Sequence, residues 1–203
     1  GHFLVAVFLM LVPIRMQREG LTEHQAIDAV LGENIHGLEL DQRCVEIAVF
    51  ALALEAWRYP NGGGYRQLPE LHLACSGLSV KAAKDEWKQL GMGKKNLSIA
   101  LDWLHKEFSD APALGSLINP TRSNATSIIS WDELLEALNS ALEKESQKAH
   151  SSEGEQQALE ATVAAQGLAK ATTMLAGQYQ WVVTNVPYLA RGKQDDILKT
   201  FIE

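Results

Sequence analysis

The chain has 203 residues, 46% of them hydrophobic and 21% charged, and a formal net charge of −7 at pH 7. This length and apolar content allow one sizeable hydrophobic core and exclude an intrinsically disordered chain. The negative charge argues against a DNA-binding surface that is complete within the chain, because duplex binding depends on lysine and arginine side chains that neutralise phosphates.

The first apolar segment, residues 3–18, predicts a helix that is packed on nearly all sides, with Pro13 bending or ending its first part. Its apolar run is about half the length that a membrane span needs. It also lacks the basic stretch and the cleavage site of a signal peptide. Because a buried element seldom opens a natural domain, we expect further sequence upstream of Gly1. A second helix is predicted from Thr22, which has the spacing of a capping box with Gln25.

Two short strands are predicted next, at residues 35–40 and 71–75. Between them a helix is predicted from Cys44 to Trp57, and Asp41 can cap it. The pattern predicts a broad buried face on this helix, made by Val45, Ile47, Ala48, Val49 and Leu52.

The middle of the chain, residues 79–177, is predicted to be a mainly helical insertion with an irregular stretch at 110–130. Ser130 and Glu133 have the spacing of another capping box. The predicted helical segments are 80–90, 97–108, 131–149 and 153–176.

The pattern then returns to that of the first 78 residues. Residues 180–184 are rich in β-branched side chains and predict a strand, and residues 194–203 predict a helix. We therefore expect an α/β core formed by residues 1–78 and 178–203, with a parallel sheet, interrupted by the helical insertion.

The two cysteines, Cys44 and Cys75, match no metal or redox spacing, and we expect both to be buried reduced thiols. The histidines form no metal-ligand spacing, so no metal is expected. These features and the lack of a membrane span favour a cytoplasmic protein without membrane contact.

Polar or small residues follow each predicted strand. Glu39 and Asp41 follow the first, residues 75–77 the second, and residues 185–188 the third. Ligands of parallel α/β sheets bind just past the carboxyl ends of strands, so these positions predict a cofactor site. Taken singly, Asp41 is equally explained as a helix cap, and residues 75–77 as a turn.

The tetrapeptide Asn185-Val186-Pro187-Tyr188 carries the most specific chemistry. An exocyclic amine of a base is a poor nucleophile, and hydrogen-bond acceptors are needed to aim its lone pair at an electrophilic methyl group. The Asn185 side chain and the Val186 backbone carbonyl offer two acceptors. Pro187 stiffens the turn, and Tyr188 offers an aromatic face for a flipped base. The alternative interpretation is a strand-to-loop exit without chemistry.

This tetrapeptide resembles Asn-Pro-Pro-Tyr, the catalytic motif of adenine-N6 and related amino methyltransferases, with Val186 in place of the first proline. Valine keeps the backbone carbonyl through which the family uses this position. The resemblance implies that Asn185, Val186, Pro187 and Tyr188 are the catalytic residues.

Other segments resemble the cofactor motifs of the same family. Residues 1–5, with Gly1 and Phe3, are similar to the tail of the motif Asp-Pro-x-Cys-Gly-Ser-Gly-x-Phe-Leu, whose opening would precede residue 1. Glu39 matches the acidic residue that takes the ribose hydroxyls of S-adenosylmethionine. Ser76 falls roughly where the family places a polar residue against the adenine of the cofactor.

The motif order resembles the gamma-type amino methyltransferases of the restriction-modification and BREX phage-defence branch. The resemblance implies a partial Rossmann-like fold and methylation of adenine N6 in double-stranded DNA, which would bind mostly through regions outside this chain. It also implies protein partners of a defence system. Without the opening of the cofactor motif, the isolated chain is expected to be inactive.

Two alternatives remain open at this stage. The first is an inert structural or interaction piece. The second is an amino methyltransferase that acts on cytosine N4 or on a protein amide.

Overall fold

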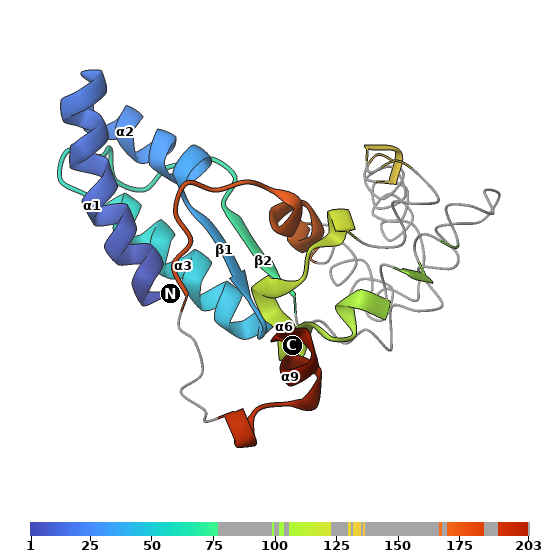
Figure 1. The fold of residues 1–203 in the computed structure, drawn as a ribbon. Coiled ribbons are helices and arrows are strands. Elements are labelled where there is room, and N and C mark those ends of the chain that lie inside the picture. The colour runs from blue at the N-terminus through green and yellow to red at the C-terminus, as the bar shows by residue number, and fades with distance from the viewer. Residues whose placement is uncertain are drawn as a thin grey trace, which may run out of the picture. The chain divides into compact units, whose positions relative to one another are not determined.

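A computed structural model describes residues 1–76, 99, 102–103, 106–122, 130, 132–134, 136, 167, 170–184 and 191–202. The chain divides into two compact units, residues 1–74 and 75–203. The described part is mainly helical with one two-stranded sheet (Figure 1). The predicted Rossmann-like fold therefore stays a prediction, as do the predicted domain boundaries.

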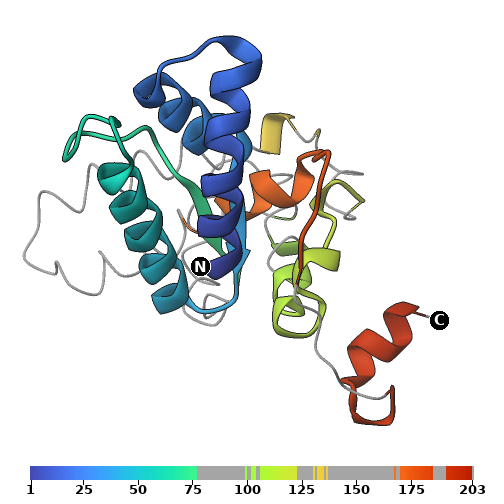
Figure 2. The same ribbon diagram turned by 90° about the vertical axis from the view of Figure 1, so that its left-hand side faces the viewer.

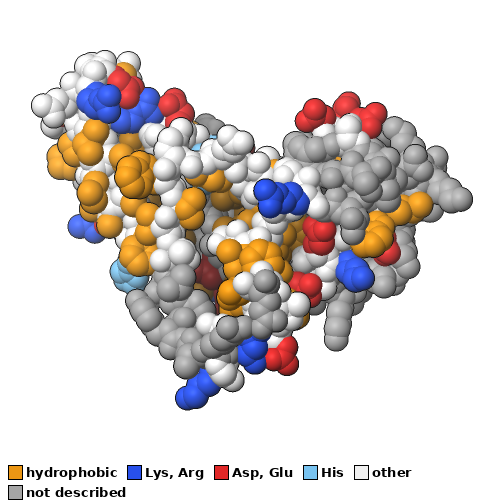
Figure 3. Space-filling view, in the orientation of Figure 1, with side chains coloured by type: hydrophobic (Ala, Val, Ile, Leu, Met, Phe, Trp, Pro, Cys, Tyr) orange, Lys and Arg blue, Asp and Glu red, His pale blue; other side chains and the backbone are white. Residues whose placement is uncertain are grey.

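Helix α1, His2–Glu19, opens the first unit and ends at Gly20, which adopts a left-handed conformation with φ 68°. The helix continues through Pro13, so the predicted alternative in which Pro13 ends its first part is wrong. The prediction that it is packed on nearly all sides is also wrong. Phe8 and Val12 are fully buried, but Met10 is 65% exposed, and Figure 3 shows apolar side chains on the surface over α1. The sequence is apolar around most of the helix, whereas only one face meets neighbouring elements.

Helix α2, Glu23–Ala29, starts with the predicted capping box, which is confirmed. The Gln25 amide N–H donates to the Thr22 hydroxyl at 3.4 Å, and the Thr22 amide N–H donates to the Gln25 side-chain oxygen at 3.1 Å. The chain then widens into a π-helical turn, η1, Val30–Asn34, which the sequence pattern did not predict.

Arg15 of α1 ties that helix to the π-helical turn. Its guanidinium donates to Glu33 at 2.7 Å, to Asn34 at 3.1 Å and to Glu19 at 2.7 Å. These hydrogen bonds raise the pKa of Arg15 and lower that of Glu19. An arginine has the planar set of donors that such a three-way contact requires.

Strands β1, His36–Glu39, and β2, His72–Cys75, form a parallel pair, and α3, Gln42–Arg58, connects them. Both strands and the helix were predicted. Figure 2 shows α3 beside α1, which it contacts.

The predicted buried face of α3 is only partly correct. Val45, Ala48 and Leu52 are buried, as expected, but Ile47 is 65% exposed and Val49 is also exposed. The buried positions follow a narrow helical stripe, and Ile47 and Val49 fall outside it.

The loop between α3 and β2 is held by specific contacts. The Trp57 indole N–H donates to the Arg66 carbonyl at 2.9 Å, and the Arg66 guanidinium pairs with Asp28 of α2 at 2.6 Å. Gly62 is a buried residue of this loop and lies close to Ile27 of α2. Residues 60–64 form no helix or strand and are an ordered part of the first unit.

In the second unit, described residues of the predicted helical segments at 97–108, 131–149 and 153–176 are helical, and residues 80–90 lie outside the described part. The Ser130–Glu133 capping box is confirmed: the Glu133 backbone N–H donates to the Ser130 hydroxyl, and the Ser130 backbone N–H donates to the Glu133 carboxylate, both at 3.4 Å. Phe108, Ala111, Leu134 and Ala171 are fully buried. The irregular stretch contains only short elements, α6 (Ala111–Leu114), η2 (Gly115–Leu117) and η3 (Pro120–Arg122).

The predicted strand at residues 180–184 is not present. Residues 181–184 form no strand, and Trp181 is 89% exposed. A β-branched sequence becomes a strand only when another strand pairs with it, and none of the described segments does so. After residue 190 come a short turn, η5 (Arg191–Lys193), and the last helix, α9 (Asp196–Ile202), close to the predicted one.

The two cysteines differ from the prediction. Cys75 is buried, but Cys44 is exposed near the start of α3, so the expectation of two buried thiols is wrong for Cys44. Over the described residues, no helix combines the length and apolar character required to cross a membrane.

Candidate cofactor and catalytic site

Glu39 is the last residue of β1 and its side chain is exposed. One carboxylate oxygen accepts the backbone N–H of Leu40 at 2.7 Å. No ion pair to Glu39 occurs in the described part of the chain. A carboxylate accepts hydrogen bonds at both oxygens, and Glu39 is therefore chemically suited to bind a diol at the end of the strand.

Asp41 has a different role, although it lies only two residues further on. Its side-chain oxygen accepts the backbone N–H of Arg43 at 2.8 Å, and Asp41 is the N-cap of α3. This contact confirms that Asp41 caps the helix.

Ser76 follows directly on β2 and is only 1% exposed. Because β1 and β2 are parallel neighbours, both strands end at the same edge of the sheet. Glu39 is the last residue of β1 and Ser76 directly follows β2, and parallel sheets bind ligands past such strand ends.

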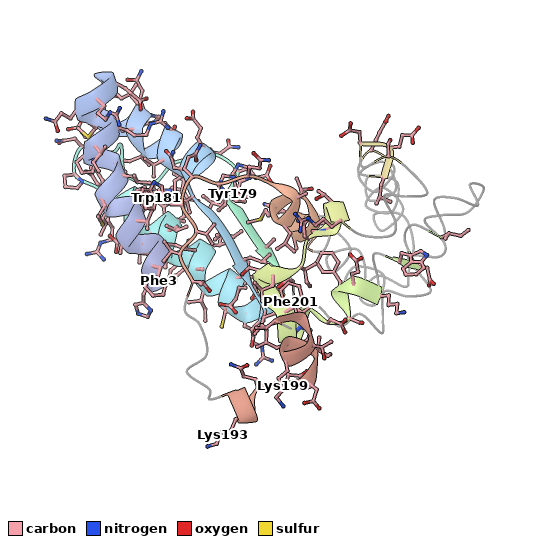
Figure 4. The ribbon with its side chains drawn as sticks, viewed as in Figure 1. Phe3, Tyr179, Trp181, Lys193, Lys199 and Phe201 are labelled. Carbon is pink, nitrogen blue, oxygen red and sulfur yellow. The ribbon has the colours of Figure 1, made fainter. Side chains whose placement is uncertain are left out.

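Gly1 and Phe3 lie at the start of α1. Gly1 is the N-cap, and its carbonyl accepts the N–H of Val5 at 3.1 Å. A β-carbon added at Gly1 would lie 3.6 Å from the α-carbon of Ala48, so the start of α1 packs against α3. Phe3 is exposed and is labelled in Figure 4.

The four predicted catalytic residues, Asn185, Val186, Pro187 and Tyr188, lie outside the described residues. Their chemistry therefore rests on the sequence alone. Of the lysines labelled in Figure 4 beyond this segment, Lys199 of α9 pairs with Asp196 at 2.7 Å, and its hydrogen bond lowers the pKa of that carboxyl.

Metal ligands were not expected from the sequence. Within the described ranges, no group of three or more histidine, cysteine, aspartate or glutamate side chains is placed to hold a metal ion.

One polar pair was missed in the sequence. His36 and His72 stack with ring centroids 4.8 Å apart and an interplanar angle of 10°. Each is the first residue of its strand, and this shared position was the signal that could have paired them.

Comparison with known proteins gives one informative similarity. The chain is 27% identical over 209 aligned residues to the adenine-specific methyltransferase PglX of Lacticaseibacillus casei (strain Zhang). The alignment covers 100% of this chain but only 16% of the length of that protein. No family model matches the chain, and no solved structure matches it. The similarity supports a distant relationship between this chain and a methyltransferase.

Proposed function

We propose that this chain is part of an S-adenosylmethionine-dependent methyltransferase. The enzyme would methylate the N6 amine of adenine in DNA, within a restriction-modification or phage-defence system. The observation that carries the proposal is the similarity to PglX, because it extends over the whole chain. The tetrapeptide Asn185-Val186-Pro187-Tyr188 supports it independently, since its residue types suit the alkylation of an amine.

The end of the β1–β2 pair fits the adenosine half of S-adenosylmethionine. The exposed carboxylate of Glu39 would accept the two ribose hydroxyls, and the buried Ser76 would lie against the adenine. The start of α1, with Gly1 and Phe3, would follow the loop that holds the methionine half, as in the family that the sequence resembles. When bound, the cofactor would supply an electrophilic methyl group on sulfur.

The chain's own residues would prepare the amine. Asn185 and the carbonyl of Val186 would accept its two hydrogens, so that the nitrogen lone pair points at the methyl group. Tyr188 would stack on the base after it leaves the duplex, and Pro187 would hold the turn rigid. No metal and no covalent enzyme intermediate are needed for this transfer.

DNA would be held mostly by surfaces outside the chain. A protein with a net charge of −7 lacks the excess of cations that phosphate neutralisation requires.

The test uses the natural protein that carries this sequence, expressed in cells that lack other adenine methyltransferases. Genomic DNA is digested and its nucleosides are measured by mass spectrometry. We expect N6-methyladenine with the unaltered protein and its loss with Asn185→Ala. A matched control is Asn119→Ala, because Asn119 only caps a short turn by accepting from Thr121 at 3.1 Å.

Three outcomes separate the alternatives. N6-methyladenine that persists at the unaltered level in Asn185→Ala would remove the tetrapeptide from the mechanism. N4-methylcytosine in place of N6-methyladenine would change the substrate but keep the enzyme class. Unmodified DNA with every variant, including the unaltered protein, would overturn the proposed reaction.

A further inference from the structure

Helix α1 is apolar around most of its circumference, although only part of it is covered. Every residue from Phe3 to Ile14 is apolar, and of these only Phe8 and Val12 are fully buried. A helix that is apolar on all sides is normally enclosed in a large core or in a membrane. This apolar run extends about 18 Å, short of the about 30 Å of a bilayer's hydrocarbon layer, which favours a protein core.

The exposed side chains of α1 follow the helical repeat. Phe3, Ala6 and Met10 are spaced three and four positions apart, and all three are exposed. Leu9 and Ile14 flank this stripe, and the four large side chains are 44–65% exposed. The space-filling view shows apolar side chains gathered over α1 (Figure 3). They therefore form one strip along the helix and not a set of scattered exposed residues.

Helix α3 presents a second apolar face. Ile47 and Phe50 are 62–65% exposed, one turn of helix apart. Cys44 is exposed one turn before Ile47. Because α3 lies beside α1 and contacts it (Figure 2), the two exposed faces belong to neighbouring helices of the first unit.

The exposed apolar area is large enough for a stable interface. If a fully exposed large apolar side chain offers about 200 Å², these exposed fractions correspond to roughly 600 Å² on the two helices. The largest apolar patch on a soluble monomer is typically about 300–600 Å². Each partner in a stable interface buries about 800 Å² in all. The two faces therefore match the apolar part of an interface better than an ordinary solvated surface.

The composition of the two faces indicates a permanent partner. Residues 3–14 contain no charged side chain, and Glu46 is the single charged residue between Cys44 and Leu54. Transient interfaces are about as polar as the rest of a protein surface, whereas permanent ones resemble a domain core cut in two. The aligned part is only 16% of the length of PglX. In a protein of that size, most of the polypeptide is available to cover α1 and α3.

We propose that the exposed faces of α1 and α3 are an internal interface, covered by an apolar and largely uncharged surface of the same polypeptide that lies outside residues 1–203. This inference rests on the greater length of the related methyltransferase and not on the proposed methyl transfer. The contact would fix the unit that carries Glu39 to the remainder of the protein.

The labelling rate of Cys44 measures whether this face is covered. The natural protein that carries this sequence is treated with a water-soluble maleimide, folded and in urea, and the Cys44 peptide is quantified by mass spectrometry. We expect labelling of the folded protein to be at least about tenfold slower than in urea, because thiol reactivity requires access. In the 203-residue chain Cys44 is exposed, so its two rates should agree within about threefold.

Cys75 is the internal control, because it is buried and should be protected in both folded proteins. Fast labelling of Cys44 in the folded natural protein overturns the proposal. Equal protection of Cys44 in the 203-residue chain also overturns it, since the cover would then lie within residues 75–203. Protection that disappears on dilution of the natural protein would indicate a second copy instead, and protection that needs added lipid vesicles would indicate a membrane.

Two charge substitutions test the same contact without a label. Met10→Glu and Ile47→Glu should each lower the melting temperature of the natural protein by roughly 5 °C or more, because each places an unpaired charge in an apolar contact. In the 203-residue chain both positions are exposed, and each shift should be less than about 2 °C. Tyr65→Glu is the control, since Tyr65 is exposed on a loop outside both helices. Unchanged melting of the natural protein with both substitutions would overturn the proposal.

Discussion

Asp41 and Glu39 are close in sequence but have different structural roles, and a substitution of Asp41 tests this distinction. Asp41→Ala removes the carboxylate oxygen that accepts the Arg43 N–H at 2.8 Å, and this contact caps the 17-residue helix α3. Loss of such a cap costs about 0.5–2 kcal/mol, typically about 1 kcal/mol. For a chain of this size, about 1 kcal/mol lowers the melting temperature by roughly 2–4 °C.

Asp41→Asn is the matched variant, because asparagine caps helices about as well as aspartate does. It keeps the acceptor oxygen and loses only the favourable charge at the helix N-terminus, which is worth about 0.3–1 kcal/mol. Its melting temperature should therefore lie between those of the unaltered chain and Asp41→Ala. Thermal unfolding followed by circular dichroism gives all three values in the same buffer.

The second half of the test concerns binding. In the natural protein that carries this sequence, Asp41→Asn should leave the KM for S-adenosylmethionine nearly unchanged. A melting temperature of Asp41→Ala equal to that of the unaltered chain would contradict the capping role of Asp41. A separate role for Asp41 is refuted if Asp41→Asn weakens cofactor use as strongly as a change at Glu39 does.

Two further predictions follow from the same part of the chain. Glu39→Gln in the natural protein should raise the KM for S-adenosylmethionine about 10- to 100-fold, because a hydrogen bond to a charged group is worth about 1.5–3 kcal/mol. The KM is measured from methylation kinetics, and an unchanged value would exclude Glu39 as the ribose ligand. Gly62→Ala should reduce the free energy of unfolding in urea by about 1–3 kcal/mol, since the added carbon would lie 2.6 Å from Ile27 Cδ1 and 3.0 Å from the Tyr59 carbonyl oxygen. Gly192→Ala is its control, because a β-carbon there meets no atom of the described residues within 4 Å. Equal losses of stability in the two variants would contradict the packing argument.

Local features of the fold were predictable from the sequence. The capping boxes at Thr22–Gln25 and Ser130–Glu133 are both present, since they depend on residues three positions apart in the chain. Asp41 could be predicted as a cap for the same reason.

Features that depend on distant partners were predicted less well. The exposure of Met10 and Ile47 is decided by which helix faces find a neighbour, and apolar composition does not contain that information. Residues 181–184 have the side chains of a strand, but strand formation needs a pairing partner. The stack of His36 on His72 depends on the register of two strands separated by a helix and a long loop.

The candidate site also combines features that the local sequence predicts with features that depend on distant partners. Residue types alone indicate what Asn185 and Tyr188 could do to an amine, because that chemistry depends on an acceptor and an aromatic face. The parallel pairing of β1 and β2 agrees with the predicted parallel sheet, since the strand ends before Leu40 and Ser76 share one edge of the sheet. The arrangement of the tetrapeptide lies outside the described residues.

The π-helical turn is attached to the rest of the first unit from two sides. Arg15 of α1 donates to Glu33 and Asn34 of the turn. From the sheet, His72 donates to the Gly32 carbonyl, and its ring stacks on that of His36. A substitution that removes one of these attachments therefore still leaves the turn bonded on its other side.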